Sequence, residues 1–103
     1  MCFQENNISC VVFNFGYLPR ASHNIATKPH TSILAIEKSL QILKIKGIIS
    51  LCVYQGGDTG FEEKDAILNF VKTLDYNKYT VIVSDFFNRP NYPPIHIKII
   101  KES

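Results

Sequence analysis

The chain has 103 residues, of which 46% are hydrophobic and 19% are charged, and its formal net charge is +2. This length accommodates one small domain and excludes a second full one. The net charge is too small to indicate a nucleic-acid-binding domain, for which a pI above about 9 is typical, although it does not exclude RNA as a partner.

The first predicted element is a strand from Ile8 to Phe15. Its apolar run is nearly continuous, which is typical of a strand covered on both faces of a parallel sheet. We therefore expect the strand to be parallel and central.

The three cysteines form no Cys-x-x-Cys spacing, and Cys10 and Cys52 lie in apolar runs, so we expect buried free thiols.

An asparagine and a tyrosine stand where this strand ends, in the run Phe-Asn-Phe-Gly-Tyr-Leu-Pro at residues 13–19. The carboxyl ends of parallel strands line the ligand crevice of an open α/β sheet, and Asn-x-x-Tyr is a spacing with which amine methyltransferases hold a nitrogen nucleophile. The amide oxygen of Asn14 can accept an amine hydrogen and so aim the nitrogen lone pair. Tyr17 can stack on a flat base, and Gly16 lets the backbone approach a ligand. A strand-end asparagine before a turn is also a common structural feature, so the motif needs further context.

A loop and a helix follow. Residues 16–29 are rich in polar residues and form a long loop at the strand's carboxyl end, of the kind that carries function. The next segment predicts an amphipathic crossover helix, with Thr31 or Ser32 as its N-cap and Gly47 as its stop. Its apolar positions recur at helical spacing at Ile33, Ile36, Leu40 and Leu43.

A second buried strand is expected from Ile48 to Tyr54, followed by a glycine-rich turn at 55–60. This turn could present backbone N–H groups to a phosphate or carboxylate, or it could simply join the strand to the next helix. That helix begins with Glu62 and Glu63 near its positive end. Its apolar face is formed by Ile67, Leu68, Val71 and Leu74.

The last third is rich in β-forming residues. Tyr79 to Phe87 and Ile95 to Lys101 predict two strands, and the connection between them is too short for a crossover helix. We therefore expect a terminal antiparallel hairpin. The sequence as a whole predicts an α/β fold over residues 1–103, with the element order β-α-β-α-β-β of a partial Rossmann-like sheet.

Histidines and lysines give weaker signals. No cysteine or carboxylate spacing around His23, His30 and His96 completes a metal shell, so no metal is predicted. His23 could be a general base near an amine, or simply an exposed loop histidine. The lysines are interpreted as solvated helix faces and strand edges; they include Lys38, Lys44, Lys46, Lys98 and Lys101.

The strand-end run and its sequel resemble a known family. Residues 14–19, Ile25, Thr27-Lys28-Pro29 and Thr31-Ser32-Ile33 resemble the rRNA methylase family of bacterial S-adenosylmethionine-dependent class I methyltransferases, whose members are linked to methylation of 5-aminomethyl-2-thiouridine in tRNA. The likeness continues in order along nearly the whole chain. Its later matches are Gly47-Ile48-Ile49, Val53-Tyr54, Gly56, Gly60, Glu63-Lys64, Phe70-Val71, Phe87-Asn88, Asn91 and Pro93-Pro94.

The resemblance implies roles for individual residues. Asn14 would orient the amine and Tyr17 would stack on it, while Asn14 and Gly16 would form part of the S-adenosylmethionine site. The backbone at Phe15, Gly16, Leu18 and Pro19 would shape the substrate pocket. Thr27 and Lys28 would either contact a substrate phosphate or only precede the helix. The implied partner is RNA, with tRNA as the expected substrate, and reaction at a sugar or a base carbon stays open as an alternative to nitrogen.

Two departures from the family pattern affect the function. Family members carry a first half whose glycine-rich turn and acidic strand end hold the cofactor, and this sequence matches only the C-terminal half. On the substrate side, Arg20-Ala21-Ser22 stands where the family has Gly-Gly-Asp, and Gly57 or Gln55 replaces a histidine. The sequence therefore predicts a truncated methyltransferase, and an inactive fragment or a small partner-binding module is the alternative.

The missing half also predicts a physical problem. Without it, the apolar edge of the first strand and the faces around Val11 and Phe13 would be open, which favours association. We expect either a marginally stable monomer or a chain that covers this edge with another copy or with an N-terminal half. No signal peptide or membrane-spanning segment is evident in the sequence, so the expected location is the cytoplasm.

Overall fold

A computed structural model of the chain describes residues 8–15, 29–54, 60–90 and 93–103. Its elements are β1 (Ile8–Phe15), α1 (Pro29–Ile42), β2 (Leu43–Val53), α2 (Gly60–Lys72), β3 (Tyr79–Ser84) and β4 (Ile95–Lys101). The predicted order β-α-β-α-β-β is confirmed, and the bounds of β1 and β4 are those that the sequence predicts.

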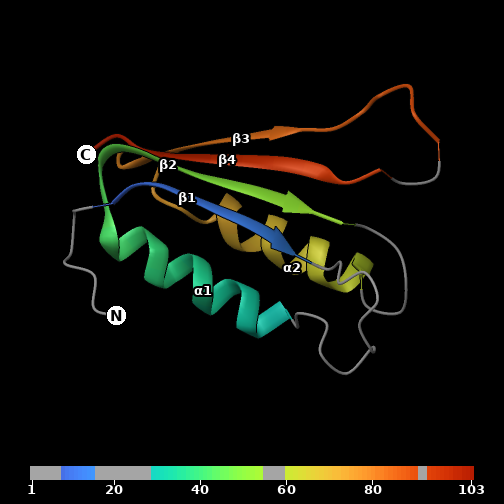
Figure 1. The fold of residues 1–103 in the computed structure, drawn as a ribbon, viewed down its shortest axis with the longest axis horizontal. Helices are drawn as coiled ribbons and strands as arrows, with labels where there is room; N and C mark the ends of the chain where they lie inside the picture. Colours follow the sequence, from blue (N-terminus) through green and yellow to red (C-terminus); the bar gives the residue numbers. More distant parts are fainter. Residues whose placement is uncertain (1–7, 16–28, 55–59, 91–92) are drawn as a thin grey trace.

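The strands form one four-stranded sheet in the order β1-β2-β4-β3 (Figure 1). β1 and β2 are parallel, whereas β4 lies antiparallel between β2 and β3, so the predicted terminal hairpin is confirmed. Because β3 is antiparallel to β4, it points the same way as β1 and β2. The carboxyl ends of these three strands, at Phe15, Val53 and Ser84, thus lie along one edge of the sheet, which we call the carboxyl edge.

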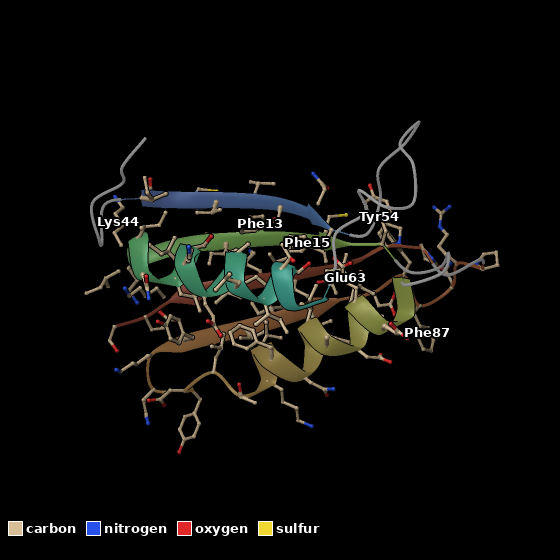
Figure 2. All side chains as sticks on the ribbon, turned by 90° about the horizontal axis from the view of Figure 1, so that it is seen from below. Phe13, Phe15, Lys44, Tyr54, Glu63 and Phe87 are labelled. Carbon is tan, nitrogen blue, oxygen red and sulfur yellow. The ribbon has the colours of Figure 1, made fainter. Side chains whose placement is uncertain are left out.

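Both helices pack on one face of the sheet (Figure 2). Cross-strand neighbours Val11, Ile49, Ile99 and Val81 share this inner face, where the central strands contribute fully buried side chains. Each buried aliphatic side chain contributes about 1.5–3 kcal/mol from its removal from water. The buried core consists of Phe15, Ile36, Leu40, Leu43, Ile49, Leu51, Val53, Ile67, Val71, Ile95, Ile97 and Ile99.

The opposite face of the sheet, which we call the outer face, carries no helix among the described residues. Its side chains follow from the register as three rows, namely Cys10-Ile48-Ile100-Thr80, Val12-Ser50-Lys98-Ile82 and Asn14-Cys52-His96-Ser84. Val12 is 66% exposed there, and Cys10 is exposed as well.

The predictions for the first strand are therefore partly wrong. β1 is an edge strand of the described sheet, and it is covered on one face only. Val11 and Phe13, expected to be open, pack against the core, and Val12 is open instead. The physical reason is that strand residues alternate between faces, so a continuous apolar run cannot say which set meets the helices. Cys10 is exposed on the outer face for the same reason.

Helix α1 starts and ends earlier than the sequence indicates. It begins at Pro29, so Ser32 lies within the helix and is buried, and neither predicted cap residue starts it. It ends at Ile42, and β2 begins at Leu43 instead of Ile48. The helix ends early because of a contact distant in sequence. Lys101 Nζ donates hydrogen bonds to the carbonyl oxygens of Leu43 at 2.9 Å and Leu40 at 3.5 Å, where α1 gives way to β2.

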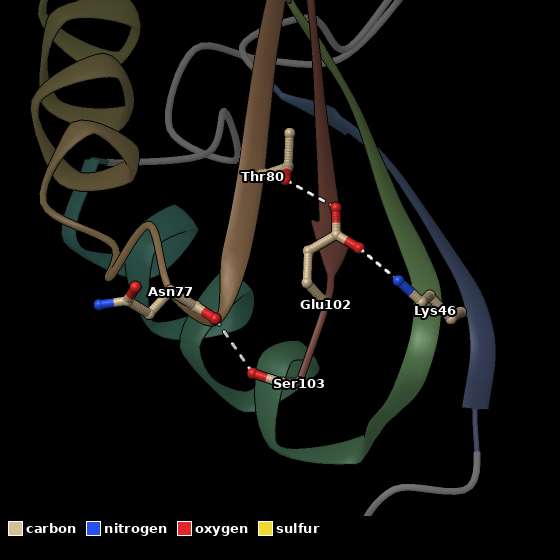
Figure 3. A network of polar contacts seen from close by, with 5 residues as sticks. All are labelled: Lys46, Asn77, Thr80, Glu102 and Ser103. Carbon is tan, nitrogen blue, oxygen red and sulfur yellow. Dashed lines mark hydrogen bonds and ion pairs between the residues drawn. The ribbon is translucent and has the colours of Figure 1, made fainter.

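Polar contacts join three strands at the edge opposite to the carboxyl edge (Figure 3). Lys46 Nζ donates to Glu102 Oε1 at 2.7 Å, and Thr80 Oγ1 donates to Glu102 Oε2 at 2.7 Å. These hydrogen bonds lower the pKa of the Glu102 carboxyl, and the bond from Lys46 has the largest effect. Lys46 has a φ of 71°, a conformation that residues other than glycine seldom adopt. The contacts fix the start of β2 against β3 and β4.

Strand β3 ends at Ser84, three residues before the predicted end at Phe87. Asp85 Oδ1 accepts the backbone N–H of Phe86 at 2.8 Å, and the Phe86 carbonyl accepts the N–H of Arg89 at 3.5 Å. These bonds turn the chain away from β4.

No helix within the described residues is long and apolar enough to span a membrane.

Candidate active site

Asn14 is the penultimate residue of β1 and lies at the carboxyl edge of the sheet. Its side chain is exposed, on the outer face, and its cross-strand neighbour is Cys52. The strand end is held firmly, because the Tyr54 N–H donates to the Phe15 carbonyl at 3.0 Å. A rigid strand thus presents an exposed amide at the edge where open α/β sheets bind ligands.

Phe15 anchors this strand end in the core. Its side chain is buried, and its ring stacks on that of Phe13 with centroids 4.9 Å apart and an interplanar angle of 16° (Figure 2). Phe15 therefore fixes the strand to the helical layer, whereas the preceding residue, Asn14, faces outward. Any contact of Phe15 with substrate is left to its backbone, as the sequence predicts.

The other predicted site residues lie outside the described part of the chain. They are Gly16, Tyr17, Leu18, Pro19, Thr27 and Lys28, and the same holds for His23 and for residues 55–59 of the glycine-rich turn. Their placement relative to Asn14 and Phe15 is therefore not described, and their roles stay predictions. Among the described residues, no group of three or more His, Cys, Asp or Glu side chains could hold a metal ion.

A serine and a histidine that the sequence did not single out as partners meet on the outer face. Ser50 Oγ and His96 Nε2 are 2.7 Å apart, and His96 is the cross-strand neighbour of Cys52, in the same row as Asn14. The pair joins β2 to β4, which are distant in sequence. Only the register of the sheet brings it together, so no local pattern could have revealed it.

Glu63 is a second group that sequence reasoning missed. It is fully buried, although Glu62 beside it is exposed. Ser32 Oγ donates to Glu63 Oε1 at 2.8 Å, which ties the first turns of α1 and α2 together, and Glu63 Oε2 has no hydrogen-bond partner among the described residues. Burial raises the pKa of the Glu63 carboxyl, and the hydrogen bond from Ser32 opposes this only in part.

The raised pKa of Glu63 predicts a pH-dependent stability. A carboxyl with a higher pKa in the folded chain contributes stability below its unfolded pKa, and this contribution is lost as the pH rises through the folded pKa. Glu63→Gln keeps an acceptor for Ser32 but cannot ionise. We therefore expect the stability of this variant, relative to wild type, to increase as the pH rises from below 4.5 through the raised pKa. Urea denaturation over a pH series measures the difference.

Two control variants separate the effect of Glu63 ionisation from the effect of its packing. Glu62→Gln alters an exposed neighbour in the same helical turn and should leave the pH profile unchanged. Glu63→Ala, which cannot ionise either, removes one partner of the buried Ser32 hydroxyl, and relative to Glu63→Gln it should cost about 1–3 kcal/mol at every pH. Parallel profiles for wild type and Glu63→Gln would show that Glu63 does not titrate as its burial predicts.

Comparisons with known proteins give a consistent set of relatives. The family model described as "Putative rRNA methylase" matches residues 2–100. A curated protein from Arabidopsis thaliana, "tRNA (mnm(5)s(2)U34)-methyltransferase, chloroplastic", is 32% identical over 100 residues, which are 97% of this chain and 36% of that protein.

Two solved structures share the fold. A "putative rRNA-methylase" from Clostridium thermocellum is 44% identical with a TM-score of 0.90, and the match covers 96% of this chain and 53% of that one. A "putative methyltransferase" from Streptococcus mutans, in complex with SAH, is 42% identical with a TM-score of 0.85 and the same coverage. The chain thus spans about half the length of the solved structures it matches.

Proposed function

The chain belongs to the rRNA methylase family, and on that premise we propose that it supplies the substrate-side half of an S-adenosylmethionine-dependent methyltransferase that methylates a nitrogen of RNA. The proposed acceptor is the aminomethyl group of a modified wobble uridine in tRNA, as the name of the Arabidopsis relative suggests. The observation that carries the proposal is the exposed Asn14 amide at the carboxyl edge, at the end of a strand whose register and core packing are fixed.

Asn14 is proposed to orient the nucleophile. Its amide oxygen accepts a hydrogen from the acceptor amine, which directs the nitrogen lone pair away from Asn14 and towards the methyl donor. Holding the reacting atoms in line contributes to rate by removing the entropic cost of orientation. Tyr17 would stack on the uracil ring, and Thr27 and Lys28 would contact the flanking phosphate. The backbone of Gly16, Leu18 and Pro19 would border the base.

S-adenosylmethionine is the proposed methyl donor, because the Streptococcus mutans relative was solved with SAH. When bound, it supplies a methyl group on a positively charged sulfur. Of the described residues, Asn14 fits this ligand, since its exposed amide can contact one polar edge of it. Gly16, the other predicted contact, lies outside the described residues. We propose that the remaining contacts come from polypeptide equivalent to the other half of the solved relatives.

The outer face is the proposed docking surface for that polypeptide. Its exposed apolar side chains include Val12 and Ile82, and the β1 edge beside Val12 is unpaired within the described sheet. The solved relatives contain roughly as much chain again beyond the matched part. Covering this face would bury Val12 and the Ser50–His96 pair and would extend the sheet at β1. The expected partner is therefore a strand-and-helix segment with an apolar face.

The test supplies the other half from a relative. The part of the Clostridium thermocellum protein outside the match is co-expressed with this chain, and transfer of labelled methyl groups from S-adenosylmethionine to tRNA is measured. We expect transfer by the assembly and none by either piece alone. An assembly that binds S-adenosylmethionine and tRNA but transfers no methyl group would contradict the proposed activity.

A binding module without catalysis is the second candidate. It is favoured by the chain spanning only about half of its solved relatives and by the exposed outer face. Such a module would assemble with the donor half as tightly as an enzyme half would. Methyl transfer by the assembly separates the two candidates, since only the enzyme half supports it.

A further inference from the structure

A turn with an exposed aromatic tip follows strand β3. Residues Phe86 to Arg89 form it, closed by the hydrogen bond from the Arg89 N–H to the Phe86 carbonyl. Phe86 is 56% exposed, and Phe87 at the tip is fully exposed. Arg89 is exposed too, and it forms no ion pair with any of the described residues. Two adjacent phenylalanines beside an exposed guanidinium are an uncommon surface, because apolar side chains are normally exposed singly.

The turn lies just beyond the carboxyl end of β3, at the same edge of the sheet as Asn14. Ser84, the last residue of β3, lies in the same cross-strand row as Asn14, and the turn begins two residues later. Figure 2 shows Phe87 and Tyr54 towards one end of the molecule and Lys44 at the other end, with Phe15 between them. Three strand spacings of about 4.8 Å separate β1 from β3, so Ser84 lies roughly 14 Å across the sheet from Asn14, and the turn follows Ser84.

The chemistry of the turn fits an unpaired nucleotide. An exposed phenylalanine ring offers a face on which any unstacked base can lie, and a guanidinium can bind the phosphate beside it. The acidic side chain just before the turn, Asp85, already accepts the Phe86 N–H at 2.8 Å. A single-stranded RNA loop that reaches Asn14 with one nucleotide can reach the turn with a neighbour several positions away, at about 3.4 Å or more per nucleotide.

We propose that Phe87 is a second base-stacking contact for the RNA substrate, with Arg89 on the adjacent phosphate. The inference rests on the proposed function, because it assumes that RNA lies along the carboxyl edge. It deepens that function by assigning specificity for unpaired nucleotides to the connection between β3 and β4. In a paired stem the bases are stacked on one another and cannot lie on Phe87.

The test measures RNA binding by the full chain. The probe is a fluorescent synthetic RNA hairpin with an anticodon-type loop, and the same stem without a loop, as a blunt duplex, is the control. Phe87→Ala should weaken binding of the hairpin by about 5- to 150-fold, the range for loss of one aromatic–base stack. Phe87→Trp keeps an aromatic face and should retain binding. Binding of the duplex should be the same for all variants.

Tyr76→Ala is the matched control for the loss of an exposed ring. Tyr76 is 87% exposed but precedes β3, so it lies at the opposite edge of the sheet. This variant should bind the hairpin like wild type. Equal weakening by Tyr76→Ala and Phe87→Ala would overturn the inference, because the effect would then be independent of position.

The remaining outcomes separate this inference from the proposed function. If wild type binds the hairpin and Phe87→Ala binds it equally well, the stacking contact is wrong and the methyltransferase proposal stands. If Phe87→Ala instead weakens assembly with the donor half and leaves RNA binding unchanged, the turn is a protein contact and the inference is overturned. Failure of wild type to bind the hairpin, both alone and assembled with the donor half, would overturn both.

Discussion

Replacing Asn14 by alanine is expected to reduce methyl transfer by the assembled enzyme by roughly 100-fold or more, the size of effect seen when a reacting group is misplaced by about an ångström. The reason is local. Asn14 is exposed, so its side chain adds nothing to the core, while its neighbour Phe15 anchors the strand. The change should therefore lower the rate of transfer from labelled S-adenosylmethionine to tRNA and leave the melting temperature unchanged.

Two further variants test the role assigned to Asn14. Asn14→Asp keeps an acceptor oxygen at the same position and should retain more activity than Asn14→Ala. Asn69→Ala removes the same exposed side chain from α2, away from the carboxyl edge, and should have wild-type activity. Transfer by Asn14→Ala at the wild-type rate would show that Asn14 does not orient the amine, even if the assembly is a methyltransferase.

Placing a charge at Val12 is expected to prevent assembly with the donor half. Val12 lies at the middle of β1 on the outer face and is 66% exposed in this chain. Covering it would leave the carboxylate of Val12→Asp buried without a partner, which costs several kcal/mol. We expect the affinity for the donor half to fall by about 100-fold or more. Binding of the separately purified halves, followed by calorimetry, measures the loss.

Leu34→Asp is the matched control. Leu34 is 50% exposed but lies on helix α1, away from the outer face, so its replacement should leave assembly unchanged. Light scattering of the chain alone provides a second measurement. A dimer that Val12→Asp dissociates would show that a second copy covers the outer face. A stable monomer whose two variants bind the donor half equally would contradict the proposed docking surface.

Much of the fold could be predicted from the sequence, because it depends on local patterns. The continuous apolar run of Ile8–Phe15 specified a strand, and its bounds are those observed. The short connection before Ile95–Lys101 specified an antiparallel hairpin. The position of Asn14 at a strand end followed from the same pattern. These features depend on residues near one another in the chain, where periodicity and turn chemistry act directly.

The tertiary structure alone decided how these elements share their faces. A strand whose apolar residues are consecutive has them on both faces, so its sequence does not specify which set of side chains meets the helices. The exposure of Val12 and Cys10 could therefore not be predicted. The early end of α1 depends on Lys101, about 60 residues away in sequence, donating to the Leu40 and Leu43 carbonyls. Contacts of this kind leave no periodic signal.

The candidate site likewise has some features that the sequence determined and others that only the tertiary structure decided. The sequence by itself determined that an asparagine ends a parallel strand and that the surrounding residues resemble a methyltransferase family. Only the tertiary structure, with β4 between β2 and β3, places Ser84 in the same row as Asn14, with the turn at Phe87 beyond it, and pairs Ser50 with His96. The order of strands in a sheet is set by the packing of all its elements at once, so no single segment of the sequence contains it.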